Sequence, residues 1–459
     1  MNLDRGKSRV SKAVANQWRG GIPLPRDFRK LSFEERREAL RTAILAPKDT
    51  GSAGLNDSGD ADFDEGALGS ELLDLSDIMI ETAVGYLPVP LGIASGFLID
   101  GYEVAVPMAV EEPSVVAAAT FAAHLIAGTG GFATWAGEPR MIAQIFLEKT
   151  KREAAQEILR REGEIAEGLT TILASMTRRG GGLRGINVER IEALGLLRVD
   201  ITIDVRDSMG ANLLNAAAEA AKDRLAAISG GAPVMSILTN EAKERLAGAR
   251  FEIPLERLRR GGLDGAEVGR RVALASEIAR VDASRAVTHN KGVMNGISAL
   301  ALATGNDTRG IEAAVHRYAA RDGAYRGVTR FFVAGASLRG EIEIPLPFAA
   351  AGGSVGLHPA TAFCLDLLGR PDGPTLARIA AAVGLAQNFA AILALVTDGI
   401  QKGHMELHAA RIARAAGARS EEIREVARLL AERGRITREG AEHILRELHR
   451  REAEARQVR

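Results

Sequence analysis

The pattern of apolar and polar positions predicts one strand with particular clarity. In residues 197–206 apolar side chains alternate with charged or hydroxyl side chains; the apolar positions are Leu197, Val199, Ile201, Ile203 and Val205. Strict alternation predicts a strand with one buried and one solvated face, as in an antiparallel sheet. A strand covered by helices on both faces would instead be an unbroken apolar run. Residues 341–346 predict a second alternating strand.

Other segments predict helices and a hairpin. Residues 150–179 are charged and amphipathic and predict one long helix, and residues 208–229 predict another directly after the first strand. Residues 97–107 predict a hairpin that turns at Asp100-Gly101. Residues 384–459 predict a series of helices. Together these elements indicate an α+β fold with at least two sheets and a helical C-terminal part.

Composition narrows the possible functions. Of the 459 residues, 46% are hydrophobic but only 4% are aromatic, which predicts an aliphatic core. Lys and Arg together number 59, as do Asp and Glu, and this balance argues against a dedicated nucleic-acid binder. A single cysteine, Cys364, excludes an internal disulfide and a cysteine-built metal site.

Targeting and membrane signals are weak. The N-terminus is basic but lacks the apolar stretch of a signal peptide. The most membrane-like stretch, residues 115–135, is rich in Ala and Gly and contains His124, and it predicts a buried helix that runs into a loop. Residues 51–66 are polar, acidic and rich in glycine, which is typical of a linker. We therefore expect a cytoplasmic protein with no membrane segment.

Two glycine-rich stretches match the spacing of a dinucleotide-binding fingerprint. Residues 180–185 fit G-x-G-x-x-G, and residues 128–133 fit the variant that ends in alanine. The fingerprint binds pyrophosphate where it joins a strand to a helix whose N-terminus faces the ligand. Both stretches here follow predicted helices, so we interpret them as loop and helix-capping glycines. A dehydrogenase of the Rossmann type is therefore disfavoured.

The segment DSMGAN at residues 207–212 is a better phosphate candidate. It joins the alternating strand directly to a predicted helix, so free backbone N–H groups and the positive end of the helix dipole point outward together. Gly210 allows a ligand to approach the backbone closely. The alternative interpretation is an ordinary helix N-cap at Asp207.

Two further segments place charged groups in apolar surroundings. Glu111 and Glu112 precede Pro113 at the entrance of a predicted helix, where acidic residues also act simply as N-terminal caps. Lys291 lies in a stretch with few acids, and an interior lysine needs a partner. Asp307 is near enough in sequence to be that partner, although a surface lysine and a turn aspartate are the simpler interpretation.

A histidine pair raises the question of a metal. His404 and His408 are four residues apart, so they share one helix face and have a spacing that can bind zinc. The glutamate between them does not stand where the H-E-x-x-H arrangement needs it. We expect no metal site, and a single functional histidine or two solvated histidines instead.

Six motifs in a fixed order carry a family resemblance. They are EEPSVVAAA (111–119), DVRDSMGAN (204–212), THNKGVMNG (288–296), ATGND (303–307), VGLAQN (383–388) and GHMELH (403–408). From about Leu72 to about Ala416 the sequence resembles 3-hydroxy-3-methylglutaryl-coenzyme A (HMG-CoA) reductase of the class II, soluble bacterial type. The segment ETAVG (81–85) is also similar to the family's subunit-contact motif, and it departs from it at Thr82 and Ala83.

The resemblance implies a reaction and its catalytic residues. The family interconverts HMG-CoA with mevalonate and coenzyme A by two hydride transfers that use NADH or NADPH. Its catalytic positions fall on Glu112, Lys291, Asp307 and His404. Lys291 would stabilise the oxyanion formed from the thioester, and His404 would protonate the departing thiolate. Glu112 would donate a proton in the second reduction, and Asp307 would hold Lys291 and couple to Glu112.

The resemblance also implies binding residues. The substrate contacts would be Ser114, Arg285, Asn295, Gln387 and Asn388, with Arg285 pairing the free carboxylate. The cofactor contacts would be Gly185, Asp207, Ser208, Met209, Gly210, Asn212 and Asn240. Relatives that prefer NADH carry an acidic residue where this chain has Gly185, and the adjacent Arg184 would tolerate a 2′-phosphate. We therefore expect a weak preference for NADPH.

The implied architecture has four parts. An N-terminal extension (1–66) precedes a discontinuous substrate domain (67–138 and 240–398), into which a small non-Rossmann NAD(P)-binding domain of antiparallel strands (139–239) is inserted. A helical C-terminal flap (399–459) would close over the site. We expect a homodimer or higher homo-oligomer with the active site between subunits, and neither nucleic acid nor membrane as a partner. The alternative is a non-catalytic regulator that binds coenzyme A or a nucleotide on the same fold; the intact catalytic positions favour the enzyme.

Overall fold

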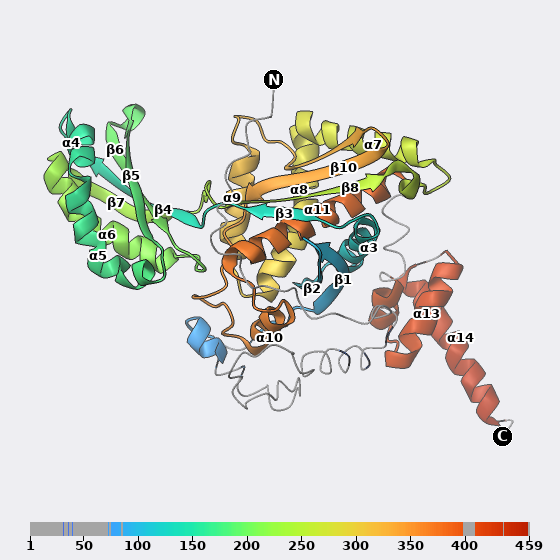
Figure 1. Ribbon diagram of the computed structural model, residues 1–459. Helices are drawn as coiled ribbons and strands as arrows, with labels where there is room; N and C mark the ends of the chain where they lie inside the picture. The colour runs from blue at the N-terminus through green and yellow to red at the C-terminus, as the bar shows by residue number, and fades with distance from the viewer. Residues whose placement is uncertain are drawn as a thin grey trace, which may run out of the picture.

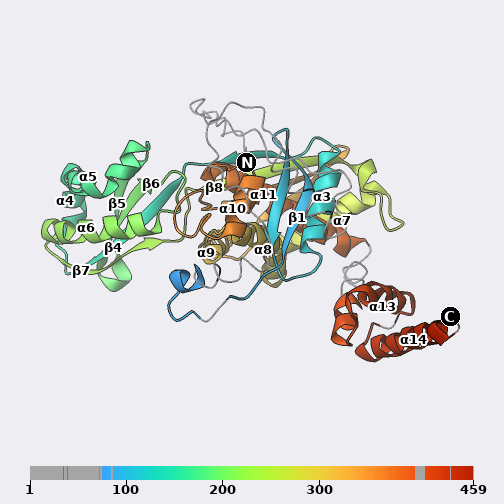
Figure 2. The same ribbon diagram turned by 90° about the horizontal axis from the view of Figure 1, so that it is seen from below.

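Buried apolar residues divide the molecule into three parts. The computed structural model describes residues 86–397, 409–434 and 436–457, together with residues 31, 35, 39, 72 and 75–83. Within these residues the apolar side chains form three separate clusters. We call the corresponding parts the central body, the small lobe (140–239) and the C-terminal unit (409–457). Figures 1 and 2 show the small lobe at one end of the molecule and the C-terminal helices at the other.

The central body contains two antiparallel sheets. Strands β1 (Leu91–Ile99) and β2 (Tyr102–Ala109) confirm the predicted hairpin, and Asp100 and Gly101 at its turn have φ angles of 50° and 87°. The second sheet has the order β3-β8-β10-β9. Its strands are β3 (Ala133–Ala136), β8 (Leu246–Pro254), β10 (Ser337–Pro345) and β9 (Thr329–Ala334). Strand β10 confirms the alternating strand predicted at 341–346.

Helices pack around these sheets, with α11 (Gly373–Val396) at the centre (Figure 1). The others are α3 (Val115–Ala127), α7 (Gly265–Val281), α8 (Ala283–Ala303), α9 (Thr308–Ala319), α10 (Pro359–Leu367) and the short 3-10 turn η3 (Leu255–Leu258). Helix α11 is the one helix of the described chain that is long and apolar enough to cross a membrane, although 78% of its most apolar window is buried inside the protein. Such all-round apolarity is typical of a core helix. The stretch that looked most membrane-like in the sequence, residues 115–135, contains α3, whose 13 residues are too few to span a bilayer.

Glycines allow α8 and α11 to approach closely. A Cβ atom added to Gly384 of α11 would lie 2.7 Å from Ile297 Cδ1, and one added to Gly296 of α8 would lie 3.0 Å from Val383 Cγ1. Gly292 of α8 faces the side chain of Asn388 less closely, since an added Cβ atom would lie 3.5 Å from Nδ2. Because protein interiors are close-packed, larger residues here would push the helices apart. This contact fixes α8, which carries Lys291, against the buried core helix α11.

The small lobe is a four-stranded antiparallel sheet covered by helices on one face. Its strand order is β5-β6-β4-β7, in a β-α-β-β-α-β arrangement. The strands are β4 (Arg140–Glu148), β5 (Gly182–Ile191), β6 (Leu196–Asp204) and β7 (Ala232–Thr239), and every neighbouring pair is antiparallel. The helices are α4 (Ala154–Arg160), α5 (Glu162–Arg178) and α6 (Ala211–Ser229), with a 3-10 turn η2 (Glu192–Leu194). The prediction of an antiparallel, non-Rossmann sheet is confirmed, whereas the single helix predicted at 150–179 is wrong, because the chain leaves helical geometry at Arg161.

The outer face of β6 is less solvated than its alternation predicts. Asp200 and Asp204 are only 4% and 1% exposed. Gln144 and Arg198 donate hydrogen bonds to Asp200, and Arg184 donates one to Asp204. Strand β6 lies inside the sheet, so side chains from β4 and β5 cover it. Buried carboxylates are tolerated here because each has a charged or amide donor.

The C-terminal unit is a small helical bundle. Helical residues 409–415 precede α13 (Ser420–Glu432) and α14 (Arg438–Gln457). Ala413, Val426, Leu430 and Ile444 form its core. Gly417, which has a φ of 96°, follows the end of the helical residues 409–415. The expected linker at 51–66 lies outside the described residues.

Candidate active site

Lys291 of α8 and Glu112 form an ion pair. Nζ of Lys291 lies 2.5 Å from Oε2 of Glu112, and the two side chains are 58% and 40% exposed. An ion pair this exposed contributes about 0–1 kcal/mol to stability. It does place an ammonium and a carboxyl side by side at an accessible surface of the central body. Within one chain Lys291 is thus a surface lysine and not an interior one, and its carboxylate partner is Glu112.

The chain between β2 and α3 positions Glu112. Helix α3 begins at Val115 with Ser114 as its N-cap. Pro113 therefore lies just before the helix and does not occupy its first turn. Ser114 has a φ of 71°, a left-handed conformation that is uncommon for residues other than glycine. Arg411 of the C-terminal unit donates a hydrogen bond from Nη2 to the carbonyl oxygen of Glu111, at 2.8 Å. The segment that carries Glu112 thus contacts the C-terminal unit directly.

Asp307 lies beyond the C-terminal end of α8. It is the N-cap of α9, and its carboxylate accepts a hydrogen bond of 3.0 Å from the backbone N–H of Gly310. Helix α8 continues for twelve residues after Lys291, to Ala303, which corresponds to about 18 Å along the helix axis. Within one chain Lys291 is therefore paired with Glu112, and Asp307 belongs to a different group of residues.

That group includes the DSMGAN segment. A Cβ atom added to Gly310 would lie 2.8 Å from Asp307 Oδ2 and 3.2 Å from Met209 Cε. Met209 and Asp307 therefore approach the same point on α9. The candidate nucleotide segment of the small lobe meets a candidate catalytic carboxylate of the central body there.

The DSMGAN segment has an open helix N-terminus. Helix α6 begins at Ala211 after Gly210, and no side chain in the described part of the chain caps it. Gly210 has a φ of 84°, and a Cβ atom at this position would lie 2.5 Å from Val205 Cγ1, so only glycine fits. Asp207 is not the N-cap, because its carboxylate accepts from the N–H of Gly373. Free N–H groups at the start of a long helix form a favourable anion site.

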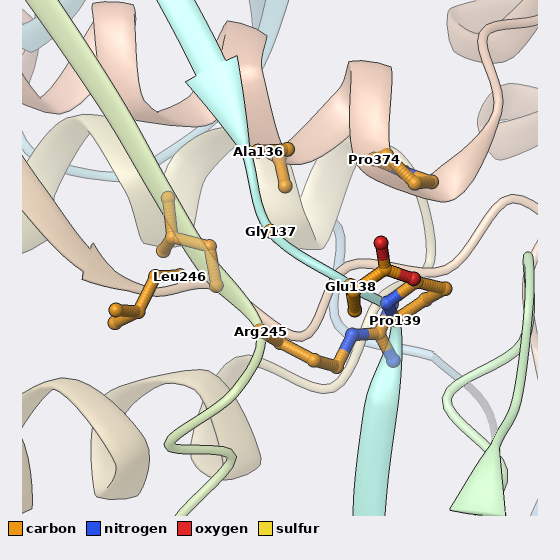
Figure 3. Close-up of a pocket in the computed structure, with 9 residues that line it drawn as sticks. Ala136, Gly137, Glu138, Pro139, Arg245, Leu246 and Pro374 are labelled. Atoms are coloured by element: carbon orange, nitrogen blue, oxygen red, sulfur yellow. The ribbon is translucent and has the colours of Figure 1, made fainter. Parts of the chain in front are cut away.

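A buried arginine joins this segment to the central body. Arg245 is 5% exposed and donates hydrogen bonds to the carbonyl oxygens of Ser208 and Phe348. Burial lowers the pKa of its guanidinium to about 10, which leaves it charged at neutral pH. Figure 3 shows Arg245 beside Glu138 and Pro139 at a small cavity where the chain passes between the central body and the small lobe.

The predicted substrate residues divide into accessible and buried ones. Arg285 and Asn295 of α8 and Ser114 are half-buried, and Asn295 follows Lys291 by one helical turn, so both lie on one face. Gln387 and Asn388 of α11 are only 4% and 1% exposed. Oε1 of Gln387 is buried and has no hydrogen-bond partner among the described residues. Such orphaned acceptors are uncommon in proteins and are consistent with a missing ligand.

The remaining cofactor and metal candidates are placed as follows. A Cβ atom added to Gly185 of β5 would meet open space, and the adjacent Arg184 bonds Asp204 Oδ2 at 2.8 Å. Asn212 and Asn240 are exposed. Residues 180–185 join α5 to β5, so the Rossmann interpretation stays excluded. His404 and His408 lie outside the described residues, and the residues that are described contain no group of three or more His, Cys, Asp or Glu side chains suited to a metal.

Sequence analysis missed Arg245 and Arg411. Both bind backbone carbonyl oxygens far away in the chain, 103 and 300 residues distant. Backbone acceptors have no residue signature, so no sequence pattern identifies such contacts. An arginine next to the predicted domain junction was the one available signal for Arg245.

The fold and site define an α+β class of protein that differs from the Rossmann dehydrogenases, because an antiparallel lobe is inserted into a central body that presents a Lys–Glu pair. Residues 33–409 match the family model described as hydroxymethylglutaryl-coenzyme A reductase. The chain belongs to this family. The resemblance identified from the six motifs is confirmed, and with it the expected enzyme class, an NAD(P)H-dependent reductase.

Similar proteins agree on the family. The chain is 42% identical over 381 residues to the 3-hydroxy-3-methylglutaryl-coenzyme A reductase of Archaeoglobus fulgidus, which covers 82% of this chain and 86% of the relative. A solved reductase from Streptococcus pneumoniae is 37% identical, with a TM-score of 0.74 over 92% of this chain and 99% of that chain. A class II reductase of the same organism, solved bound to NADPH, is 38% identical with a TM-score of 0.74 over 81% and 99% of the two chains. The class II type is thereby confirmed.

Proposed function

We propose that this chain catalyses the NADPH-linked interconversion of HMG-CoA with mevalonate and coenzyme A, at a site shared by two subunits. One observation carries the proposal: Lys291 and Glu112 meet at 2.5 Å on two segments that match the family's motifs. A regulator that had lost catalysis would have no need to keep an accessible ammonium and carboxyl in contact.

Each residue has a defined chemical task in this reaction. Two molecules of the reduced cofactor, bound one after the other, would supply one hydride each. Lys291 stabilises the oxyanion that develops on the thioester carbonyl, and one such donor contributes about 100- to 1,000-fold in rate. Glu112, after its carboxylate has taken up a proton, donates that proton to the aldehyde oxygen in the second reduction, a role that contributes about 100- to 10,000-fold. Its contact with Lys291 keeps both groups at the same oxygen.

His404 protonates the coenzyme A thiolate as it leaves. The support comes from Arg411, which follows His404 by seven residues and contacts the carbonyl of Glu111, next to Glu112. Arg411 thus anchors the described start of the C-terminal unit beside Glu112. We therefore retain residues 399–459 as a flap that completes the site on closure.

The residues present fit a nicotinamide nucleotide, and NADPH better than NADH. The open N-terminus of α6 and the small Gly210 suit a pyrophosphate. At the adenosine end, Gly185 leaves open space and no carboxylate to bind a ribose hydroxyl, while the side chain of Arg184 is 32% exposed. An arginine suits a 2′-phosphate because its planar fork can bind two phosphate oxygens. Asp207, Ser208, Met209, Asn212 and Asn240 complete this site.

Two copies of the chain are needed for a complete site. Lys291 lies near the middle of α8 and Asp307 lies four residues beyond its C-terminal end, so within one chain the helix separates them by about 18 Å, and we infer that a second subunit supplies one of them. Residues 78–91, which include part of the ETAVG segment, expose large apolar side chains, and Ile78 and Leu87 are 78% and 90% exposed. Apolar surface of this kind marks a protein–protein interface. The assembly we propose is a homodimer or a multiple of it.

The division into domains follows the three core clusters. Residues 67–138 with 240–398 form the substrate domain, residues 139–239 the nucleotide domain, and residues 1–66 an extension whose role is not part of the reaction. The balanced charge argues against a nucleic-acid partner, and the burial of α11 inside the protein argues against a membrane span, so we propose a cytoplasmic enzyme.

The test is cofactor oxidation by purified protein with HMG-CoA. Lys291→Ala should lower kcat by at least about 100-fold and leave the KM for NADPH nearly unchanged, because the ammonium acts mainly on the transition state. Lys149→Ala, which removes a lysine whose side chain is 81% exposed on the small lobe, should keep the parent activity. A Lys291→Ala variant as active as the parent would refute the mechanism, and a parent without any turnover would favour the regulator.

A further inference from the structure

A closed ring of hydrogen bonds lies on the opposite side of α8 from Lys291. Nε2 of His289 is 2.6 Å from Oγ1 of Thr329, and the Thr329 hydroxyl donates to Oδ1 of Asn388 at 2.7 Å. Nδ2 of Asn388 then donates to the carbonyl oxygen of His289 at 3.0 Å. The ring begins and ends at His289 and joins α8, β9 and α11. All three residues are 2% exposed or less.

The directions of these bonds define the proton positions. Thr329 gives its hydroxyl proton to Asn388, so its oxygen accepts from His289, and Nε2 of His289 carries the proton. Nδ1 is buried and has no partner in the described part of the chain. Burial and the nearby Arg285 lower the pKa of His289 to about 4. The imidazole is therefore neutral at neutral pH, and the ring is intact.

The next residue of α8 is held as well. Nδ2 of Asn290 donates to the carbonyl oxygen of Arg326, and its Oδ1 accepts from the N–H of Val328, both at 2.9 Å. A Cβ atom added to Gly327 would lie 3.2 Å from His289 Cδ2, so the segment 326–329 packs directly against the histidine. Both residues that precede Lys291 are thus bonded to the chain around β9. This turn of α8 is fixed by side chains as well as by its own backbone.

We infer that His289, Thr329 and Asn388 are positioning residues that hold the Lys291 ammonium in register with Glu112, an inference that rests on the proposed function. The resemblance implied a substrate contact for Asn388. The oxygen and the nitrogen of its side-chain amide are both hydrogen-bonded within the ring instead, and the residue is only 1% exposed. Asn388 acts on the substrate through α8 and Lys291.

The kinetic consequence is specific. Small displacements of a catalytic group weaken its interaction with the transition state more than they weaken binding of the ground state. Opening the ring should therefore lower kcat, and should leave the KM for HMG-CoA almost unchanged. A purely structural role would lower the melting temperature and leave kcat per folded site as it was.

Thr329→Val tests this, because it keeps the shape of the side chain and removes the hydroxyl. In the full-length enzyme we expect kcat to fall about tenfold with the KM for HMG-CoA within about twofold. Thr329→Ser, which keeps the hydroxyl, should restore kcat to within about threefold of the parent. Ser276→Ala is the matched control, because Ser276 is fully buried and accepts a hydrogen bond from Phe331 of the same strand outside the ring. It should lower the melting temperature and keep kcat.

The outcomes separate the ring from the function. A parent enzyme that turns over HMG-CoA together with a Thr329→Val variant of parent kcat would overturn the positioning role and leave the proposed function intact. A parent without turnover would overturn the proposed function. Should Thr329→Val not fold, Thr329→Ala breaks the same bonds without placing a methyl group against polar atoms. It must then show the same loss of kcat, and an unchanged kcat overturns the inference.

Discussion

Two regions along helix α8 are constructed differently: the region around Lys291, in the middle of the helix, and the region around Asp307, just beyond its C-terminal end. Around Lys291, the helix is packed against α11 through glycines and tied to β9 and α11 by the His289 ring. Around Asp307, the candidate groups lie on connections between elements, and Gly210 has a left-handed conformation. Arg245 reaches the small lobe at the Ser208 carbonyl and the central body at the Phe348 carbonyl. The region around Lys291 is held rigid by packing, whereas the region around Asp307 is joined to the small lobe by a few polar contacts.

The proposed reaction explains why one site combines both designs. Two hydride transfers need two cofactor molecules, so an oxidised cofactor has to leave and a reduced one has to enter while the partly reduced substrate stays bound. The substrate end therefore benefits from a fixed cation, because its oxyanion forms at one place. The cofactor end has to open and close, which polar contacts at a junction between two domains permit.

The largest predicted effect is complementation between two inactive variants. Lys291→Ala and Asp307→Asn should each be nearly inactive alone. In a mixed dimer one of the two shared sites receives Lys291 from one chain and Asp307 from the other, both intact. Random mixing gives half mixed dimers, so activity should return to about one quarter of the parent. The measurement is NADPH oxidation after the two variants are unfolded together and refolded.

The control is each variant refolded alone, which should stay inactive. If the mixture is no more active than its components, Lys291 and Asp307 act within one chain. A movement of α8 would then have to bring Lys291 and Asp307 together, and the proposal that two subunits share the site would fail.

A smaller effect is expected at the adenosine end of the cofactor site. Gly185→Asp places a carboxylate in open space beside Arg184, where it would repel a 2′-phosphate and accept from a ribose hydroxyl. Because the new carboxylate repels the 2′-phosphate, we expect kcat/KM for NADPH to fall by about tenfold, which corresponds to about 1.4 kcal/mol. The value of kcat/KM for NADH should be kept or should rise.

Gly163→Asp is the matched control, since it adds a carboxylate to the same lobe in the first turn of α5, where a Cβ atom also meets open space. It should leave both cofactor constants unchanged. Equal loss of both cofactors in Gly185→Asp would contradict the assignment of this position to the 2′-phosphate.

Sequence analysis predicted the fold class and the small antiparallel sheet because alternation in residues 197–206 is a local signal. It also identified Lys291 and Glu112 as chemically important, through motifs. It failed where burial depends on neighbouring strands, as for Asp200 and Asp204, which local alternation places in solvent. It also failed to find the His289 ring, because hydrogen bonds between residues 40 and 99 positions apart leave no periodic pattern. Long-range polar contacts need coordinates.

The smallest predicted effect concerns the contact between the C-terminal unit and the region around Lys291. Arg411→Ala removes the hydrogen bond to the Glu111 carbonyl, and a bond of this kind is worth about 1 kcal/mol, or roughly a fivefold change in an equilibrium. If this contact helps to hold the flap near Glu112, kcat should fall by about two- to fivefold with the melting temperature unchanged. Arg414→Ala is the matched control, because Arg414 is exposed on the same helix. Identical rates for the two variants would show that the flap closes without this contact. The Lys291–Glu112 pair would then not depend on the C-terminal unit for its position.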